Sequence, residues 1–143
     1  MKLKGKYILA YTAGIFDGEG CISIVRRKGK KGFYCQLYIS VGSTDEWLAE
    51  WLKMQYGGSV IFCEREGNKQ NLWKWNLWSR KATTFLALIL PYLNLKRPQA
   101  ELAIGFQLKN NKLGKTDAEL AIIEAERLMM GKMNKRGRGK ETV

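Results

Sequence analysis

The sequence contains two pairs of segments that alternate between apolar and polar residues, and a polar or glycine-rich turn joins each pair. Residues 21–27 and 33–41 flank KGKKG, and residues 59–66 and 71–79 flank GNKQ. The clearest segment places five apolar side chains on one face of a strand: Phe33, Cys35, Leu37, Ile39 and Val41. Two hairpins of this kind predict an antiparallel sheet that helices cover on one side only.

Helical segments precede both hairpins and follow the second one. Apolar residues recur with helical spacing over residues 6–16, and a cap, first-turn acids and a closing Gly-Gly pair mark a helix at residues 43–58. Three more helices are predicted at residues 81–93, 98–110 and 116–130, the last beginning with a capping box. This order of elements indicates an α+β fold with a four-stranded antiparallel sheet.

The length of 143 residues and a hydrophobic fraction of 45% suit one packed domain, which we place at residues 1–130. Residues 131–143 are charged and broken by glycines, which predicts a basic, flexible tail. Apolar stretches are shorter than the roughly 20 residues of a bilayer span, so we expect no membrane association and an intracellular protein, in a prokaryotic cytoplasm or an organelle. Cys21, Cys35 and Cys63 show no C-x-x-C spacing and are expected to be buried free thiols.

The charge balance restricts the partners and the chemistry. The chain has 25 Lys and Arg against 13 Asp and Glu, a net charge of +12, which is typical of a protein that binds nucleic acid; an anionic membrane surface is the second choice. It has no histidine, which excludes Ser-His-Asp hydrolysis, His-containing zinc sites and nucleases with a histidine base. Catalysis would depend on carboxylates, lysines, hydroxyls and an oxygen-binding metal.

The segment AGIFDGEG places two acids among three glycines at the end of the first predicted helix. Ala10, Gly14 and Gly18 lie four residues apart, which leaves one helix face without bulk and lets a second helix backbone approach closely. Gly18 and Gly20 suggest that the helix stops here, so that Glu19 extends from its end. Two such helices would bring two carboxylates together, an arrangement that a divalent cation stabilises and that suits phosphodiester hydrolysis.

The segment TAGIFDGEG resembles the LAGLIDADG motif of homing endonucleases. The residues identical to the motif are Ala13, Gly14, Asp17 and Gly20. Glu19 replaces an aspartate and Thr12 replaces the leading leucine. SVGSTDEWLAEWLKMQYGGSV and LPYLNLKRPQAELAIGF are also similar to segments of that family, so the resemblance extends over about residues 7–106. It implies the αββαββα fold, with a DNA-binding sheet and helices on the opposite face.

The resemblance also implies roles for single residues. Glu19 corresponds to the acid that binds the essential metal, Mg²⁺ with Mn²⁺ as an alternative, and Gly18 to the residue whose backbone approaches it. Asp17 corresponds to the acid that caps and orders the helix crossing, Lys96 to a basic residue near the scissile phosphate, and Ser43 to a water-positioning residue. From the residues alone, the two acids also suit an ordinary helix end, Lys96 a solvated lysine, and Ser43 a helix cap.

One motif implies a homodimer that cuts each strand of a pseudo-palindromic double-stranded DNA once, leaves short 3′ overhangs and serves intron homing. The predicted dimer interface consists of Ala10, Ala13, Gly14, Asp17 and Gly18. The predicted base-contacting residues are Ser23, Val25, Arg27, Tyr34, Gln36, Tyr38, Ser40, Arg65, Lys74 and Asn76. The predicted phosphate contacts are Lys28, Lys30 and Lys31.

Two other functions fit the same fold and charge. One is an RNA maturase that assists splicing by binding intron RNA, and the other is a DNA-binding relative that does not cleave. A transcription regulator on the same scaffold is more distant. The presence of both Glu19 and Lys96 favours the endonuclease.

Overall fold

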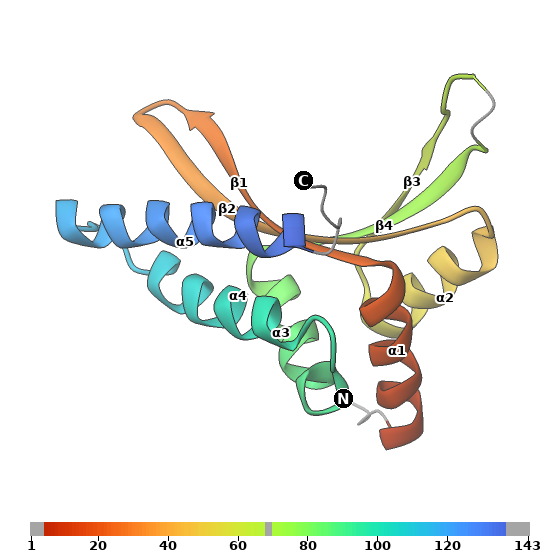
Figure 1. Cartoon of the computed structure of the whole chain (residues 1–143). Helices are drawn as coiled ribbons and strands as arrows, with labels where there is room; N and C mark the ends of the chain where they lie inside the picture. The colour runs from red at the N-terminus through yellow and green to blue at the C-terminus, as the bar shows by residue number, and fades with distance from the viewer. Residues whose placement is uncertain (1–4, 68–69, 137–143) are drawn as a thin grey trace.

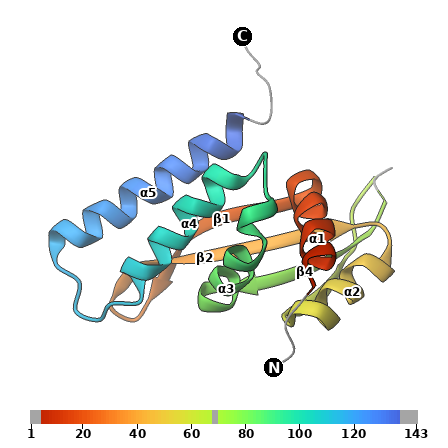
Figure 2. The ribbon, with the colours of Figure 1, turned by 90° about the horizontal axis from the view of Figure 1, so that it is seen from below.

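A four-stranded antiparallel sheet forms the centre of the molecule, with helices on one face and the other face open (Figure 1, Figure 2). The computed structural model describes residues 5–67 and 70–136. Within this part the strand order is β1-β2-β4-β3. The strands are β1 (Gly20–Gly29), β2 (Gly32–Ser43), β3 (Ser59–Cys63) and β4 (Leu72–Trp78). The α+β fold expected from the sequence is confirmed.

Five α-helices and one 3₁₀ turn complete the described part of the chain. The helices are α1 (Lys6–Glu19), α2 (Glu46–Tyr56), α3 (Ser79–Ile89), α4 (Arg97–Asn110) and α5 (Asp117–Arg136), and the 3₁₀ turn is Leu90–Tyr92. The elements from α1 to α3 follow the αββαββα order, and α4 and α5 are added after it. No helix among the described residues combines the length and the apolar character that crossing a membrane requires.

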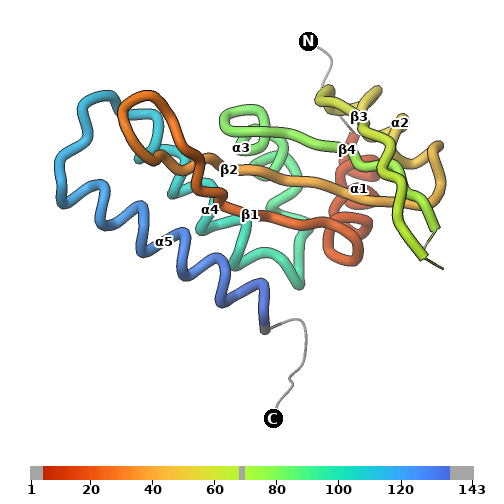
Figure 3. Tube along the Cα trace, turned by 90° about the horizontal axis from the view of Figure 1, so that it is seen from above, coloured from red at the N-terminus to blue at the C-terminus, as the bar shows by residue number. Residues whose placement is uncertain are grey.

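The two hairpins curve the open face of the sheet. Figure 1 shows the free ends of β1–β2 and β3–β4 rising away from the helices on opposite sides of the molecule. Figure 3 shows the same face from above, with β2 and β4 in the middle and α5 beside β1. The sheet therefore presents an uncovered surface that four strands share.

Apolar side chains of one strand parity meet the helices and form the core, as the alternation predicted. β2 contributes Leu37, Ile39 and Val41, all buried. Three aromatic rings join α1, α3 and β4: Phe85 lies edge-on to both Phe16 and Trp75, with ring centroids 5.5 and 5.0 Å apart. The indole N–H of Trp75 donates to the Gly57 carbonyl at 2.7 Å, so the buried nitrogen is satisfied.

The last helix is longer than the sequence predicted. α5 begins with the expected capping box, in which Thr116 and Glu119 bond each other's backbone N–H, and a hydrogen bond from Lys112 is the main cause that lowers the pKa of Glu119 to about 2. Residue 130, where we expected the domain to end, lies inside this helix. In the following turn, Asn134 donates to the Ile22 carbonyl of β1 at 2.9 Å and fastens the helix to the sheet. Residues 137–143 of the expected tail lie outside the described residues.

Gly20 joins α1 directly to β1, and we expect its replacement by alanine to destabilise the fold. Its N–H closes α1 by donating to the Phe16 carbonyl, and a Cβ at this position would overlap the fully buried Phe16 ring. Gly20→Ala should lower the free energy of unfolding by about 1–3 kcal/mol in urea titrations, because a packed ring has no room to move. Gly131→Ala, where a Cβ meets no atom within 4 Å in the described structure, is the control; equal stability of both variants would contradict this packing.

Candidate functional site

The two acids at the end of α1 lie in different surroundings. The Asp17 carboxylate accepts hydrogen bonds from the backbone N–H groups of Asn94 at 2.8 Å and Lys96 at 3.0 Å. In return, the Lys96 ammonium donates to the Asp17 carbonyl at 2.9 Å, where a cation also stabilises the negative end of a helix. These three bonds fasten the end of α1 to the turn before α4. Asp17 is therefore a positioning residue within one chain, rather than a free carboxylate.

Glu19 is the last residue of α1, and its side chain is exposed. Among the described residues, none forms a hydrogen bond or an ion pair with its carboxylate. The backbone at Gly18 is also accessible, because a Cβ there would meet no atom within 4 Å of the described structure. Asp17 thus brings Lys96 to the segment that carries Glu19, while Glu19 itself stays available to a ligand.

The described part of the chain holds no cluster of three or more His, Cys, Asp or Glu side chains that could surround a metal ion. One exposed carboxylate beside open backbone does not fit a fully protein-coordinated ion such as structural zinc. It fits an ion that keeps several waters and takes further ligands from phosphate oxygens, which is how Mg²⁺ binds. The remaining ligands would have to come from a second chain and from the substrate.

The exposed side of α1 carries large side chains, Tyr7 and Tyr11, as well as small residues. Of the predicted interface residues, Asp17 is half-buried and bonded within its own chain, and the other four fall into two groups. Ala10, Gly14 and Gly18 are exposed, and a Cβ at either glycine would meet no atom of residues 5–67 and 70–136 within 4 Å. Ala13 is completely buried in the core of its own chain, so its assignment to the dimer interface is wrong. Ala13 belongs to the inward face of the helix, together with Phe16.

Thr12, which departs from the leucine of the motif, also lies on the inward face. Its hydroxyl donates to the Ile8 carbonyl at 2.8 Å and lies 2.7 Å from the Tyr56 hydroxyl of α2. Burial raises the pKa of Tyr56, and the bond to Thr12 acts in the opposite direction. A polar residue is tolerated at this buried position because a hydroxyl on α2 meets it.

Ser43 orders the entry to α2. Its hydroxyl accepts from the Asp45 backbone N–H at 3.0 Å, and the Asp45 carboxylate caps α2 by accepting from the Trp47 N–H at 3.0 Å. Ser43 follows Val41 in the alternation of β2, and Val41 is buried under the helices. These contacts give Ser43 a structural role in the turn.

The open face of the sheet holds most of the predicted DNA-contacting residues. By strand alternation it carries Ser23, Val25, Arg27, Tyr34, Gln36, Tyr38 and Lys74, each exposed or half-buried. Lys28, Lys30 and Lys31 are exposed around the β1–β2 turn. This surface therefore combines donors in the middle with cations at one raised end.

Two predicted base contacts are buried, and a third, the exposed Arg65, lies outside the strands. Ser40 and Asn76 are only 4% and 2% exposed. The Asn76 amide is bonded to its neighbours, because the Tyr38 hydroxyl donates to its oxygen and its nitrogen donates to the Lys74 carbonyl at 3.0 Å. In this structure neither side chain is accessible from outside. Arg65 lies beyond β3, which ends at Cys63, and donates to the Gln70 carbonyl at 2.6 Å. It belongs to the loop between β3 and β4.

Trp78 and Cys21 also lie on the open face and were not among the predicted contacts. Trp78 ends β4 and packs against Tyr38, with ring centroids 4.2 Å apart. Cys21 is exposed next to Ser23 and was expected to be a buried thiol. Strand alternation could have placed both residues on the open face. Trp78 follows Lys74 and Asn76 at a period of two, and Cys21 precedes Ser23 by two residues.

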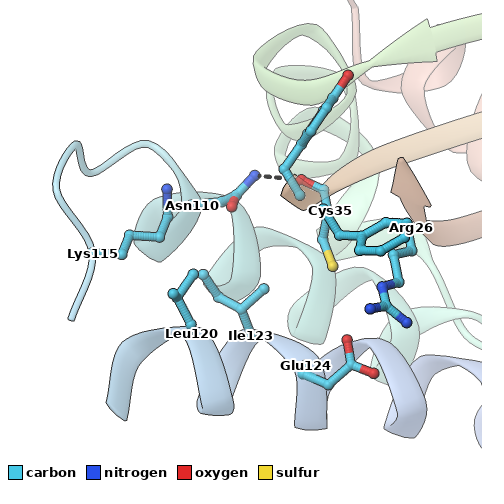
Figure 4. A pocket seen from close by; sticks show the side chains of 9 residues that line it. Arg26, Cys35, Asn110, Lys115, Leu120, Ile123 and Glu124 are labelled. Atoms are coloured by element: carbon cyan, nitrogen blue, oxygen red, sulfur yellow. Dashed lines mark hydrogen bonds between the residues drawn. The ribbon is translucent and has the colours of Figure 1, made fainter. Parts of the chain in front are cut away.

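A cavity of about 380 Å³ lies elsewhere, between the β1–β2 hairpin and helices α4 and α5 (Figure 4). Its lining includes Arg26, Cys35, Ile123 and Glu124, and Asn110 donates to the Cys35 carbonyl at 3.0 Å. Burial, with a smaller effect of Glu124, raises the pKa of the Cys35 thiol and makes it a poor nucleophile. Neither Glu19 nor Lys96 lines this cavity, so it is separate from the site at the end of α1.

Similar proteins were found by comparison of structures and not by comparison of sequences. No protein-family model matches the sequence, and no curated protein sequence matches it. The structure is similar to that of the homing endonuclease I-CvuI in complex with its target, with a TM-score of 0.77, 23% identity and coverage of 96% of this chain and 87% of that one. It is also similar to the archaeal intron-encoded homing endonuclease I-Vdi141I complexed with DNA, with a TM-score of 0.76, 13% identity and coverage of 98% and 89%.

A third similar structure is the LAGLIDADG homing endonuclease I-SmaMI bound to cleaved DNA, with a TM-score of 0.65 and 22% identity. The match covers 85% of this chain but 42% of that one. All three identities are low, so the likeness concerns the arrangement of the elements in space. The prediction from TAGIFDGEG is confirmed at that level: this chain has the fold of the LAGLIDADG homing endonucleases.

Proposed function

We propose that this protein is a divalent-metal-dependent, site-specific homing endonuclease that acts on double-stranded DNA as a homodimer. The observation that carries the proposal is the position of the exposed Glu19 carboxylate, directly beside an open, basic sheet and at the end of a helix with open space at Gly14 and Gly18 among the described residues. Similar structures that contain DNA, among them one with cleaved DNA, support a role on duplexes.

The open sheet supplies the surface for DNA. The major groove is wide enough for a two-stranded β-ribbon. In the proposed dimer, each half of the target would lie along the open sheet of one copy. Lys28, Lys30 and Lys31 at the hairpin turn suit phosphates, and their contribution would weaken as salt rises. Arg27, Gln36 and Tyr38, nearer the middle, suit base edges.

The exposed small residues of α1 would supply the contact between two copies. This chain covers 87% of I-CvuI but 42% of I-SmaMI, so a chain of the second length has room for two such units. A chain with one unit would obtain the second by self-association through Ala10, Gly14 and Gly18. Such a dimer has two-fold symmetry, which favours a pseudo-palindromic target and one cut in each strand.

Glu19 from both copies would hold Mg²⁺ or Mn²⁺ at the crossing, together with backbone at Gly18 and phosphate oxygens. When bound, the metal supplies Lewis-acid polarisation of a phosphate and a more acidic water. Asp17 keeps the end of α1 in place through its bonds to the turn before α4. Lys96, which this turn brings against the Asp17 carbonyl, adds positive charge next to the reacting phosphate. Short 3′ overhangs are the expected product.

Replacing Glu19 by glutamine should greatly slow cleavage and keep binding. The experiment incubates wild type and Glu19→Gln with a randomised duplex library and Mg²⁺, sequences the cut ends, and measures binding to the selected site. Loss of the carboxylate should slow cleavage by about 100-fold or more. Glu50→Gln, an exposed acid on α2, is the control. Cleavage by Glu19→Gln at the wild-type rate refutes the site, and faster splicing of a structured RNA without any cut favours a maturase.

Asp17→Asn should affect stability instead. An amide offers one acceptor oxygen and turns its NH₂ group toward one of the two backbone donors at Asn94 and Lys96. The free energy of unfolding should fall by about 1–3 kcal/mol, while Glu19→Gln should leave it unchanged. Urea unfolding of both variants measures this. Equal stability of the two would show that the bonds from Asp17 to Asn94 and Lys96 contribute nothing to the free energy of unfolding.

Gly14→Leu should separate folding from association. The described residues of one chain leave open space at this position, so the variant should still fold and give a far-UV circular dichroism spectrum like that of the wild type. A leucine between two closely packed helices should prevent them from meeting, and sedimentation should show a dimeric wild type and a monomeric variant. Gly131→Leu, at an exposed position on α5, should remain dimeric. A monomeric wild type, or a dimeric Gly14→Leu, would argue against this interface.

A further inference from the structure

Three side chains from three strands meet on the open face of the sheet. The Trp78 ring of β4 lies against the Tyr38 ring of β2, with centroids 4.2 Å apart and an interplanar angle of 38°. The Arg27 guanidinium of β1 lies over the Trp78 ring, 4.5 Å from its centroid. The arginine side chain thus leans from the raised hairpin toward the middle of the sheet, away from the lysines at the turn.

Other contacts fix the two rings beneath the arginine. Tyr38 donates its hydroxyl to the buried Asn76 amide, which is itself bonded to the Lys74 carbonyl. Trp78 precedes Ser79, whose φ of +53° is the only positive value among the described residues other than glycine. Two side chains hold that unusual backbone: Gln36 donates to the Ser79 hydroxyl at 3.1 Å and Thr83 to its carbonyl at 3.2 Å. A strained conformation that several bonds maintain is a common mark of a functional position.

The chemistry of a stacked arginine selects the ligand. A guanidinium that lies on an aromatic face keeps its N–H groups directed outward in its own plane, where they match the paired O6 and N7 acceptors of guanine. In the described part of the chain no carboxylate forms an ion pair with Arg27. Much of the side-chain entropy that a flexible arginine would lose on binding is already lost in folding.

The neighbouring arginine provides a comparison. Arg26 also stacks on an aromatic ring, that of Phe33 at 4.1 Å, but it lines the cavity on the helix-covered side together with Glu124. The two residues have the same chemistry and adjacent positions, and only Arg27 is on the open face. This makes Arg26 a matched control.

We propose that Arg27, held on Trp78, is a specificity-determining residue that recognises one guanine per half-site in the major groove. This inference rests on the proposed function, since it assigns a base to the sheet surface that would bind DNA. It predicts that the loss of the planar fork changes which sequence is chosen, whereas the loss of a phosphate contact would weaken all sequences alike.

The test is a binding selection from a randomised duplex library, followed by affinity measurements on the selected site and its single-base variants. Wild type should select a guanine at one position of each half-site. Arg27→Lys keeps the charge but loses the fork, so preference for that guanine should fall about 5- to 100-fold while the salt dependence stays the same. Trp78→Leu should weaken the same preference without changing any charge, and Arg26→Lys should leave it intact.

The outcomes separate this inference from the proposed function. If wild type selects a duplex and Arg27→Lys keeps the same base preference, the assignment of guanine to Arg27 is refuted while the endonuclease proposal stands. A uniform loss of affinity across all sequences also refutes it, because that result identifies a phosphate contact. If wild type selects no duplex at all, both proposals fail together.

Discussion

The absence of any loop between α1 and β1 is the constraint on which the rest of the structure depends. Glu19 is the last helical residue and Gly20 is the first residue of the sheet, so the acid and the sheet surface cannot move independently. Phe16 secures this junction from inside the core, and Asp17 secures it from the side by bonding the turn before α4. The Glu19 carboxylate and the open face of the sheet are thereby held in fixed positions relative to each other.

The open face is organised before any ligand arrives. Several of its polar groups satisfy each other, as Tyr38 and Asn76 do across β2 and β4 and as Gln36 and Ser79 do at the start of α3. The donor groups used in these bonds are occupied within the chain and keep their neighbours in place, while Gln36 and Tyr38 themselves stay half-buried on the face. The face thus contains a supporting layer and a smaller set of residues that are free to make contacts.

Local patterns in the sequence predicted the elements well, and the structure shows where such patterns stop being informative. Alternation located both hairpins, and the Thr116–Glu119 pair located the start of α5. Alternation assigned Asn76 to the open face correctly, yet its burial depends on Tyr38, which only strand pairing brings beside it. For Ala13, small size did not reveal whether the residue faced inward or outward.

Long-range contacts account for the other differences. The partners of Asp17 are 77 and 79 residues away in the sequence, and Asn134 meets β1 across 112 residues. Nothing near Asp17 distinguishes a carboxylate that binds two backbone N–H groups from one that binds a metal. The resemblance to a known motif located the acids, and the fold was needed to assign a different task to each.

The position of α5 beside β1 has a consequence for the exposed edge of the sheet. An edge strand of ten residues is a template for uncontrolled strand addition, and that process leads to open-ended aggregates. Helix α5 contacts β1, and the Asn134 amide occupies the Ile22 carbonyl, while the opposite edge, β3, has only five residues. With one sheet edge covered and the other short, the sheet offers little room for strand addition, so the proposed pairing through α1 would end at a closed pair instead of a growing fibre.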